Sequence, residues 1–278
     1  MKEGKKMDST DIARRMKEYE KNNNGKLMKR TPVIVRVDGR GFSKYTKTFK
    51  KPFDMIMVKA MQDTMMYLCK NVHGCVIGYT QSDEISLVLV DYHDVNVAPF
   101  YDNNIQKMCS VIASMTTMAF NKYFAEGVND LYYNMCKESL GDEPDEDKVE
   151  EYNDALKRYK NKTWNAMFDC RVFNVPKDEV ANYLFWRQSD ASRNSVQAVA
   201  HANFTQKELD NITVNNMQNK LFTEKGINWN DYPTELKRGS CCIRKVIPNG
   251  SLKWIVDHEI PIFKESGRDY VEKLIRFE

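Results

Sequence analysis

The sequence predicts a protein of the α+β class, in which strands and helices are segregated along the chain rather than alternating. Strand-like apolar runs come early, at residues 33–37 and 75–90, and return near 241–247 and 254–256 after a helix-rich middle. This order favours a sheet with packed helices over a doubly wound parallel sheet. With 278 residues and 42% hydrophobic content, the chain can bury a substantial core.

Charge and cysteine content narrow the class of protein. The chain carries 42 Lys or Arg against 39 Asp or Glu, a net charge of +3, so any nucleic-acid contact must come from a local patch. Its seven cysteines include no pair two to four residues apart, which indicates reduced thiols and argues against a zinc knuckle. No apolar run approaches the about 20 residues of a membrane span. We therefore expect a cytoplasmic protein without membrane contact, or an organelle-imported one if a transit peptide has been removed.

The chain is expected to form one domain over residues 1–278, with a basic arm at 1–30, a core at 31–245 and an extension at 246–278. The arm holds ten Lys or Arg against five Asp or Glu. Residues 8–21 can form a polar helix, which the Asn-Gly run behind it should end. The arm is either a solvated segment or a contributor to nucleic-acid binding.

The first candidate site follows a β-branched run, residues 33–37, which predicts a strand buried on both faces apart from Arg36. The strand leads into a tight turn, Asp38-Gly39-Arg40-Gly41-Phe42-Ser43. Its glycines let backbone groups approach a ligand closely, and successive N–H groups suit a triphosphate. The Asp38 carboxylate suits Mg²⁺, which prefers oxygen ligands. On its own, Asp-Gly is also a common turn signal, and Arg36 could pair with an acid inside the sheet.

A second acidic turn, Gln81-Ser82-Asp83-Glu84, joins two strand-like runs as in a β-hairpin. Asp83 and Glu84 should point to opposite faces, so we expect Asp83 to lie beside Asp38. Carboxylates gathered in this way repel each other unless a cation offsets the repulsion. Two acids from one strand end and one hairpin suggest a two-metal nucleotidyl-transfer site, as in polymerase palms.

Other segments predict the framework around these turns. Asp54 should cap a helix to about residue 70, whose stripe Met57, Met61, Met65 and Leu68 faces the core. A second core helix is expected at 104–124, and the acidic stretch 142–151 is a solvated loop or a helix start. The remaining expectations are a strand at 168–175, a helix opened by Pro176, a capping box at Thr205 and Glu208, and an amphipathic helix at 264–278.

Several short blocks together carry a family resemblance. They are RVDGRGF at 36–42, KP at 51–52, GYTQSDEIS at 78–86, FDCRV at 168–172, WRQSD at 186–190, NKLF at 219–222 and GINWN at 226–230. In this order and spacing, the chain resembles the tRNA-histidine guanylyltransferase family over about residues 15 to 245. The resemblance implies a polymerase-palm-like antiparallel sheet and an enzyme, a 3′-to-5′ nucleotidyltransferase that extends the 5′ end of tRNA.

The resemblance also implies roles for individual residues. Two Mg²⁺ ions would be held by Asp38, Asp83 and the Gly39 carbonyl, and the catalytic set would be Asp38, Asp83 and Glu84. GTP and ATP would be the substrates. Their binding residues would be Asp38, Gly39, Arg40, Gly41, Phe42, Ser43, Lys51, Ser82, Asp83 and Lys107. Arg187, Arg193 and Asn194 would contact RNA weakly, although helix-surface hydrogen bonding would also explain them.

Two departures from the family pattern place the chain nearer the like-protein branch, which repairs 5′-truncated tRNAs by templated addition. Residues 192–195 read Ser-Arg-Asn-Ser where the tRNA-histidine-specific branch has His-Ile-Asn-Asn, and Met217 lies near the position of a usual lysine. The alternatives are strict addition of one guanylate to tRNA-histidine, a nucleotide cyclase on a related palm, or a tRNA-binding protein without catalysis. The resemblance further implies a homotetramer.

Overall fold

A six-stranded antiparallel sheet organises the protein, which we describe from a computed structural model covering residues 9–21, 24–140, 145–248 and 250–276. The strand order is β4-β1-β3-β2-β5-β6. The strands are β1 Val33–Gly39, β2 Cys75–Gln81, β3 Glu84–Leu89, β4 Phe168–Asn174, β5 Ser240–Val246 and β6 Leu252–Asp257. This antiparallel arrangement confirms the predicted α+β class.

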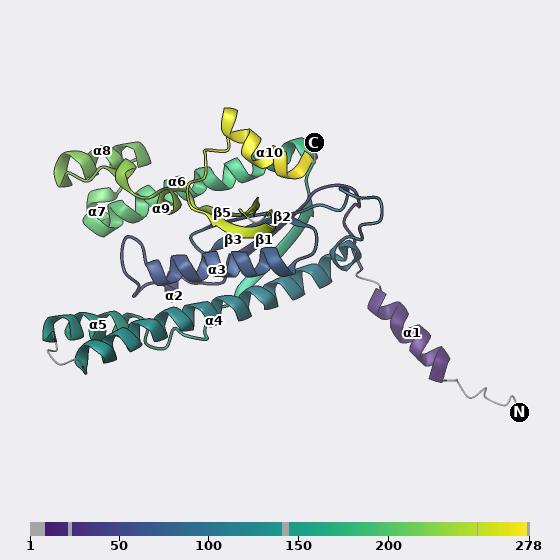
Figure 1. The fold of residues 1–278 in the computed structure, drawn as a ribbon, viewed down its shortest axis with the longest axis horizontal. Helices are drawn as coiled ribbons and strands as arrows, with labels where there is room; N and C mark the ends of the chain where they lie inside the picture. Colours follow the sequence, from purple (N-terminus) through teal and green to yellow (C-terminus); the bar gives the residue numbers. More distant parts are fainter. Residues whose placement is uncertain (1–8, 22–23, 141–144, 249, 277–278) are drawn as a thin grey trace, which may run out of the picture.

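Two long helices, α3 (Met55–Asn71) and α4 (Ile105–Ser139), cover one face of the sheet, while α6 (Val180–Asn203) and α10 (Asp269–Arg276) cover the other (Figure 1). Successive β1 residues pack into opposite layers: Val35 joins the core under α3 and α4, and Ile34 joins the core under α6 and α10. The central strand is therefore buried on both faces, as its β-branched sequence predicts.

The helix α3 begins and packs as the sequence predicts. The Asp54 carboxylate accepts a hydrogen bond from the Met57 N–H at its N-terminus. Met61, Met65 and Leu68 are almost completely buried in the core beneath it. Most of the methionine stripe is thus core, although Met57 is half-buried and lines a cavity together with Met61.

The helix α4 continues well past residue 124, where we expected it to end. Gly127 lies inside the helix, and a Cβ added there would meet the Ile56 side chain of α3 at 2.8 Å. Packing against α3 therefore both requires the glycine and keeps it helical, against its low intrinsic propensity.

The remaining helices are shorter. They are α1 Ser9–Lys21, α2 Phe42–Tyr45, α5 Glu146–Arg158, α7 Gln206–Leu209, α8 Val214–Lys225 and α9 Thr234–Arg238, with 3₁₀ turns at η1 Phe100–Asn103, η2 Lys177–Glu179, η3 Trp229–Asp231 and η4 Glu265–Arg268. The acidic stretch after 141 is a helix start, capped by Asp145, while residues 141–144 and the expected first helical residue, Asp8, lie outside the described residues. Thr205 and Glu208 form the predicted capping box.

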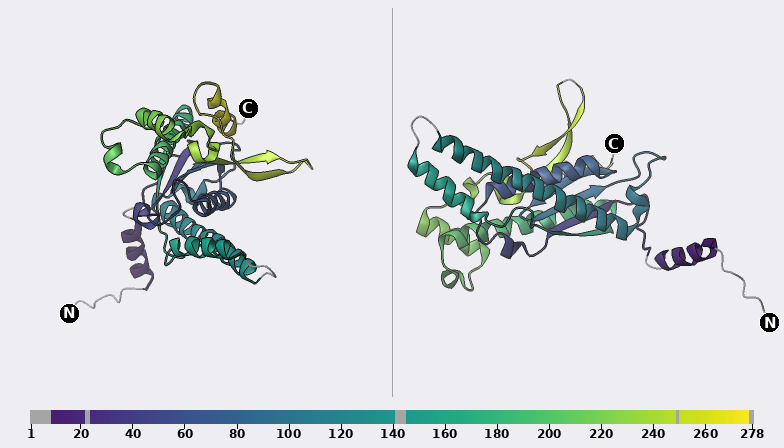
Figure 2. Two further views of the ribbon diagram at one scale, coloured as in Figure 1. Left: turned by 90° about the vertical axis from the view of Figure 1, so that its left-hand side faces the viewer. Right: turned by 90° about the horizontal axis from the view of Figure 1, so that it is seen from below.

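The C-terminal segment belongs to the same sheet. β5 pairs with β2 from Gly78 to Thr80, and β6 pairs with β5, although both β6 and α10 lie beyond the expected end of the core at residue 245. Figure 2 shows the β5–β6 hairpin projecting from the body. None of the described helices is both long and apolar enough to cross a membrane.

Candidate active site

The two acidic turns meet at one edge of the sheet. Asp38 near the end of β1 pairs in register with Glu84 at the start of β3. The Gly39 N–H donates a hydrogen bond of 3.1 Å to the Asp83 carbonyl. The structure therefore brings Asp38 and Asp83 together across neighbouring strand ends, as the sequence pattern indicates.

Negative charge accumulates at this edge. Burial raises the pKa of the Asp83 carboxyl, and the nearby Asp38 and Glu84 carboxylates raise it further, against hydrogen bonds from the Asp83 backbone and the Ser82 hydroxyl. Asp38 keeps about a third of its side chain exposed. A cation bound between Asp38 and Asp83 would relieve this repulsion, so the residues present fit a divalent metal ion.

The few oxygen ligands at this edge also suit a metal ion whose remaining ligands come from a bound nucleotide. In the part of the chain that the structure describes, no group of three or more His, Cys, Asp or Glu side chains could hold a metal ion by itself. Mg²⁺ is commonly bound by one or two carboxylates together with substrate phosphates. Asp38, Asp83 and the Gly39 carbonyl match that pattern.

Glu84 has a different environment from its two neighbours. Its side chain is buried and accepts two hydrogen bonds from Arg187, from Nε at 2.7 Å and from Nη2 at 2.6 Å. Arg36 Nη2 lies 3.0 Å from the same carboxylate and 3.9 Å from Asp38. The Glu84 oxygens are thus engaged by arginines, and the catalytic role that we expected for Glu84 stays a prediction.

Three arginines near this edge pair with acidic side chains of the same chain. Arg187 is buried and paired with Glu84 and Asp190, so the structure gives it partners other than the RNA phosphate we expected. Arg193 is exposed and pairs with Asp190. Arg36 pairs with an acid inside the sheet, as considered from the sequence. Its Nε is buried and has no hydrogen-bond partner among the described residues.

The turn after β1 is shorter than the sequence indicated. Gly39 still belongs to β1, and Phe42 and Ser43 already belong to α2. The N–H groups of Gly39 and Arg40 are engaged by the Asp83 and Met167 carbonyls. Those of Gly41, Phe42 and Ser43 remain the candidates for a phosphate.

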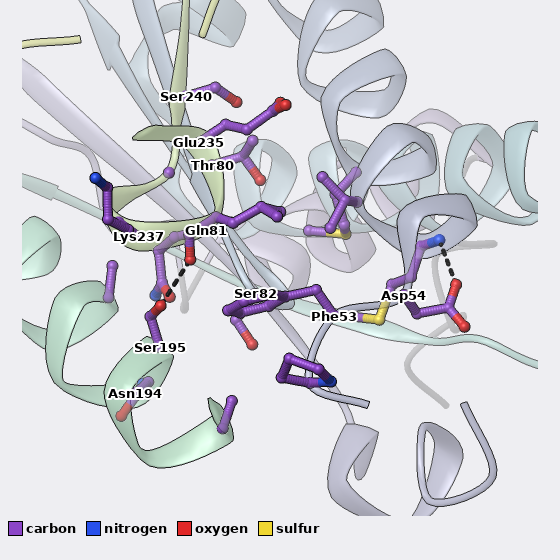
Figure 3. A pocket seen from close by; sticks show the side chains of 18 of the residues that line it. Phe53, Asp54, Thr80, Gln81, Ser82, Asn194, Ser195, Glu235, Lys237 and Ser240 are labelled. Carbon is purple, nitrogen blue, oxygen red and sulfur yellow. Dashed lines mark hydrogen bonds between the residues drawn. The ribbon is translucent and has the colours of Figure 1, made fainter. Parts of the chain in front are cut away.

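A cavity of about 240 Å³ opens beside the second acidic turn (Figure 3). Its walls come from the loop before α3, the end of β2, the middle of α6 and the segment around α9. Three residues expected at a nucleotide or RNA site line it: Lys51, Ser82 and Asn194. Thr80, Ser195, Glu235 and Ser240 also line it, and none of them was expected at the site from the sequence. The Lys51-Pro52 block pointed to the first wall, but nothing in the sequence linked α9 to it.

Lys107 does not join this site. It lies in the first turn of α4, and its ammonium sits 4.7 Å from the centre of the Tyr101 ring. The Asp38 end of β1 meets α4 thirteen residues later, where the Phe42 and Phe120 ring centres are 5.6 Å apart. At 1.5 Å per residue, Lys107 is about 20 Å away along the helix. The triphosphate contact expected for Lys107 is therefore not made within this chain.

An antiparallel palm-like sheet with two acids at one edge and a cavity beside them is typical of one class of enzyme, the nucleotidyltransferases. The family model described as tRNA(His) guanylyltransferase matches residues 13–176. The chain belongs to the tRNA(His) guanylyltransferase family.

Similar proteins agree with this assignment. A bacterial tRNA(His) guanylyltransferase-like protein in complex with ATP superimposes with a TM-score of 0.80 at 40% identity, covering 96% of this chain and 100% of that one. A like-protein in complex with GTP gives 0.74 at 37%, covering 95% and 99%. The tRNA(His) guanylyltransferase of Schizosaccharomyces pombe is 26% identical over 84% of this chain and 80% of its own length.

Proposed function

We propose that this enzyme adds nucleotides to the 5′ end of tRNA, in the 3′-to-5′ direction, and repairs 5′-truncated tRNAs by templated addition. The observation that carries the proposal is the approach of Asp38 and Asp83 at one sheet edge, where the Gly39 N–H bonds to the Asp83 carbonyl. Similar structures in complex with ATP and with GTP support nucleotides as substrates.

The chain's own residues would bind and orient the reactants. Asp38, Asp83 and the Gly39 carbonyl would hold two Mg²⁺ ions. Such ions would lower the pKa of an attacking hydroxyl and neutralise negative charge on a triphosphate. Lys51 and Ser82, which both line the cavity, would orient the triphosphate. Glu84, fixed by Arg187, would hold β3 in register with Asp38.

The proposed reaction has two steps. The 5′-monophosphate of the tRNA first attacks the α-phosphate of ATP, which releases pyrophosphate and leaves an adenylylated 5′ end. The 3′-hydroxyl of an incoming nucleoside triphosphate then attacks the 5′-phosphate, and AMP leaves. The added nucleotide carries its own triphosphate at the new 5′ end.

Met217 supports the repair branch over strict guanylate addition. It is buried in the small core between α6 and α8, where a lysine would lose the hydration of its ammonium. Near the position of the lysine that is usual in the tRNA-histidine-specific branch, this chain therefore has a buried apolar side chain.

The test uses a tRNA that lacks its first nucleotide and is labelled at its 5′-phosphate, incubated with Mg²⁺, ATP and the other triphosphates. Longer products whose label has become resistant to phosphatase are expected, because addition makes that phosphate internal. Growth that leaves the label phosphatase-sensitive, or no growth, would overturn the proposal. A strong preference for intact tRNA-histidine with one added guanylate would overturn the repair part.

The assembly and location of the enzyme are further parts of this proposal. We propose a single catalytic domain that acts as a homotetramer in the cytoplasm. Light scattering should then give four times the chain mass of 32.5 kDa, and a monomer or dimer mass would refute the tetramer.

A further inference from the structure

A tryptophan is exposed on α6 near the acidic edge of the sheet. Trp186 is 51% exposed, although tryptophan is highly buried on average. The Arg187 guanidinium lies 4.5 Å from the centre of its ring, and the Tyr183 ring meets it edge-on, with the ring centres 5.9 Å apart. Because Arg187 is itself held by Glu84 and Asp190, the indole is fixed in place and offers a rigid, flat surface to solvent.

Trp186 lies on the same face of the sheet as Asp38. Its neighbour Tyr183 packs against Phe173 of β4, with the ring centres 5.7 Å apart, and Phe173 belongs to the layer under α6. Residues an even number of positions apart on a strand point to the same face, so Asp169 shares the face of Phe173. Asp169 is the register partner of Asp38, which places the first acidic turn on this face as well.

A chain of contacts connects the indole to Asp38. Arg187 donates to the Glu84 carboxylate at 2.6 Å. Arg36 Nη2 lies 3.0 Å from that carboxylate and 3.9 Å from Asp38. The cavity opens elsewhere, since its wall includes the end of β2, and β2 and β4 lie on opposite sides of the β1–β3 pair. A nucleotide in the cavity would therefore leave the β4 side of Asp38 to the RNA.

The exposed arginines on this face are already paired with acids. Arg171 of β4 lies 3.5 Å from Asp169, and Arg193 of α6 pairs with Asp190. Such a balanced surface has little charge left to attract phosphates. A nucleobase carries no charge and stacks on an aromatic ring, and stacking tolerates any base because every base has a flat face. The surface around Trp186 therefore suits an unpaired nucleobase of any sequence.

We propose that Trp186 stacks on the unpaired nucleobase of the RNA 3′ strand that lies opposite the missing 5′ nucleotide, a role that rests on the proposed function. In a 5′-truncated tRNA this nucleobase has lost its pairing partner. Stacking would hold it beside Asp38, where a nucleotide that enters from the cavity could pair with it. Base pairing would then select the nucleotide, and Trp186 would be a positioning residue that reads no sequence.

The test uses a stem-loop RNA with a 5′-monophosphate and a 3′ overhang, in which the first unpaired nucleobase is 2-aminopurine. Stacking quenches the fluorescence of this base. The full chain is added in Mg²⁺ without triphosphates, so neither activation nor addition takes place. The wild type should quench the probe. Trp186→Leu, which keeps an apolar side chain without a flat ring, should leave the probe bright at saturation.

Affinities for the same RNA give a second readout. Trp186→Leu should bind the overhang RNA about fivefold to a hundredfold more weakly than wild type, because stacking of one base on an aromatic ring contributes on that scale. Trp186→Phe keeps a flat ring and should retain both the quenching and an affinity within about threefold of wild type. Trp186→Gln takes the place of Trp186→Leu if that variant does not fold.

Two matched controls accompany the test. A blunt stem-loop carries one more 5′ nucleotide, which pairs with the 2-aminopurine, and Trp186→Leu should bind it within about threefold of wild type. Trp164→Leu changes a tryptophan that is 66% exposed and lines a surface groove with residues of α4. This variant should keep the quenching and the affinity for the overhang RNA.

Three results would overturn the inference: a bright probe with the wild type at saturation, equal quenching by Trp186→Leu, or equal weakening of the overhang and blunt RNAs in that variant. Because the assay contains no triphosphate, its outcome is separate from that of the proposed function. Quenching that depends on Trp186 without tRNA growth would end only the proposed function. Growth without that quenching would end only this inference.

Discussion

Arg187 holds Glu84 through two parallel hydrogen bonds, Nε to Oε1 at 2.7 Å and Nη2 to Oε2 at 2.6 Å. Both side chains are buried, and they come from opposite elements, α6 and β3. Glu84 is the register partner of Asp38. The ion pair therefore fixes β3, which carries the second acidic turn, against α6. Arg36 of β1, 3.0 Å from the same carboxylate, links in the strand that carries the first turn.

Removing one member of this pair should destabilise the protein strongly. Arg187→Met leaves a buried carboxylate without its main partner, and we expect a loss of about 3–5 kcal/mol in the free energy of unfolding, measured by urea denaturation. The double variant Glu84→Gln with Arg187→Met should lose clearly less than the sum of the single changes, since the two residues interact directly. Stability within about 0.5 kcal/mol of wild type in Arg187→Met would contradict this role.

The two glycines of the first acidic turn should respond differently to alanine. A Cβ at Gly39 would lie 2.3–2.7 Å from atoms of the Phe42 ring, so Gly39→Ala should cost about 1–3 kcal/mol by overpacking and displace the adjacent Asp38. Gly41 has open space but a φ of +66°, so Gly41→Ala should cost about 1–2 kcal/mol through its backbone alone. Nucleotide addition should fall much further in Gly39→Ala; equal activities would contradict the account.

The anchoring of the segment before β1 should depend on pH. Hydrogen bonds from Lys26, and to a smaller extent from Lys29, lower the pKa of the Asp102 carboxyl to about 2. The pKa of an aspartate in an unfolded chain is about 3.9. Because the folded pKa is depressed, this contribution is present above about pH 4 and is lost as the pH falls toward 2. Hydrogen exchange of the Leu27 amide, which donates to Asn103, reports it directly.

Asp102→Asn is the comparison for that measurement. At pH 6 the variant should exchange the Leu27 amide faster than wild type, and at pH 2 the two proteins should exchange it alike. A difference that is the same at both pH values would show that the carboxylate charge does not hold this segment.

Local patterns in the sequence were sufficient to predict the strands and the meeting of Asp38 with Asp83. The β-branched run before Asp38 and the hairpin around Asp83 each specify a strand end. Antiparallel pairing of β1 with β3 then places these two ends side by side. The partner of Glu84 could not be found in this way, because Arg187 is 103 residues away. The wall built by Glu235 and Gln62 joins residues 173 apart.

Lys107 illustrates a different limit. The family pattern places basic residues near the triphosphate, but the position of Lys107 depends on how α4 runs along the sheet. The contact between Phe42 and Phe120 shows which part of α4 lies beside Asp38. Helix length and packing, rather than sequence spacing, decided where this side chain lies.

The most direct measurement of the central claim counts divalent ions at the two aspartates. Mn²⁺ binding in the presence of GTP, followed by electron paramagnetic resonance, should show two ions in the wild type. Asp38→Asn and Asp83→Asn should each lose at least one ion while their melting curves stay cooperative. The control Glu259→Gln, which changes a carboxylate that accepts a hydrogen bond from the Thr234 hydroxyl, should keep both. An unchanged ion count in both aspartate variants would contradict the assignment of Asp38 and Asp83 as the metal ligands.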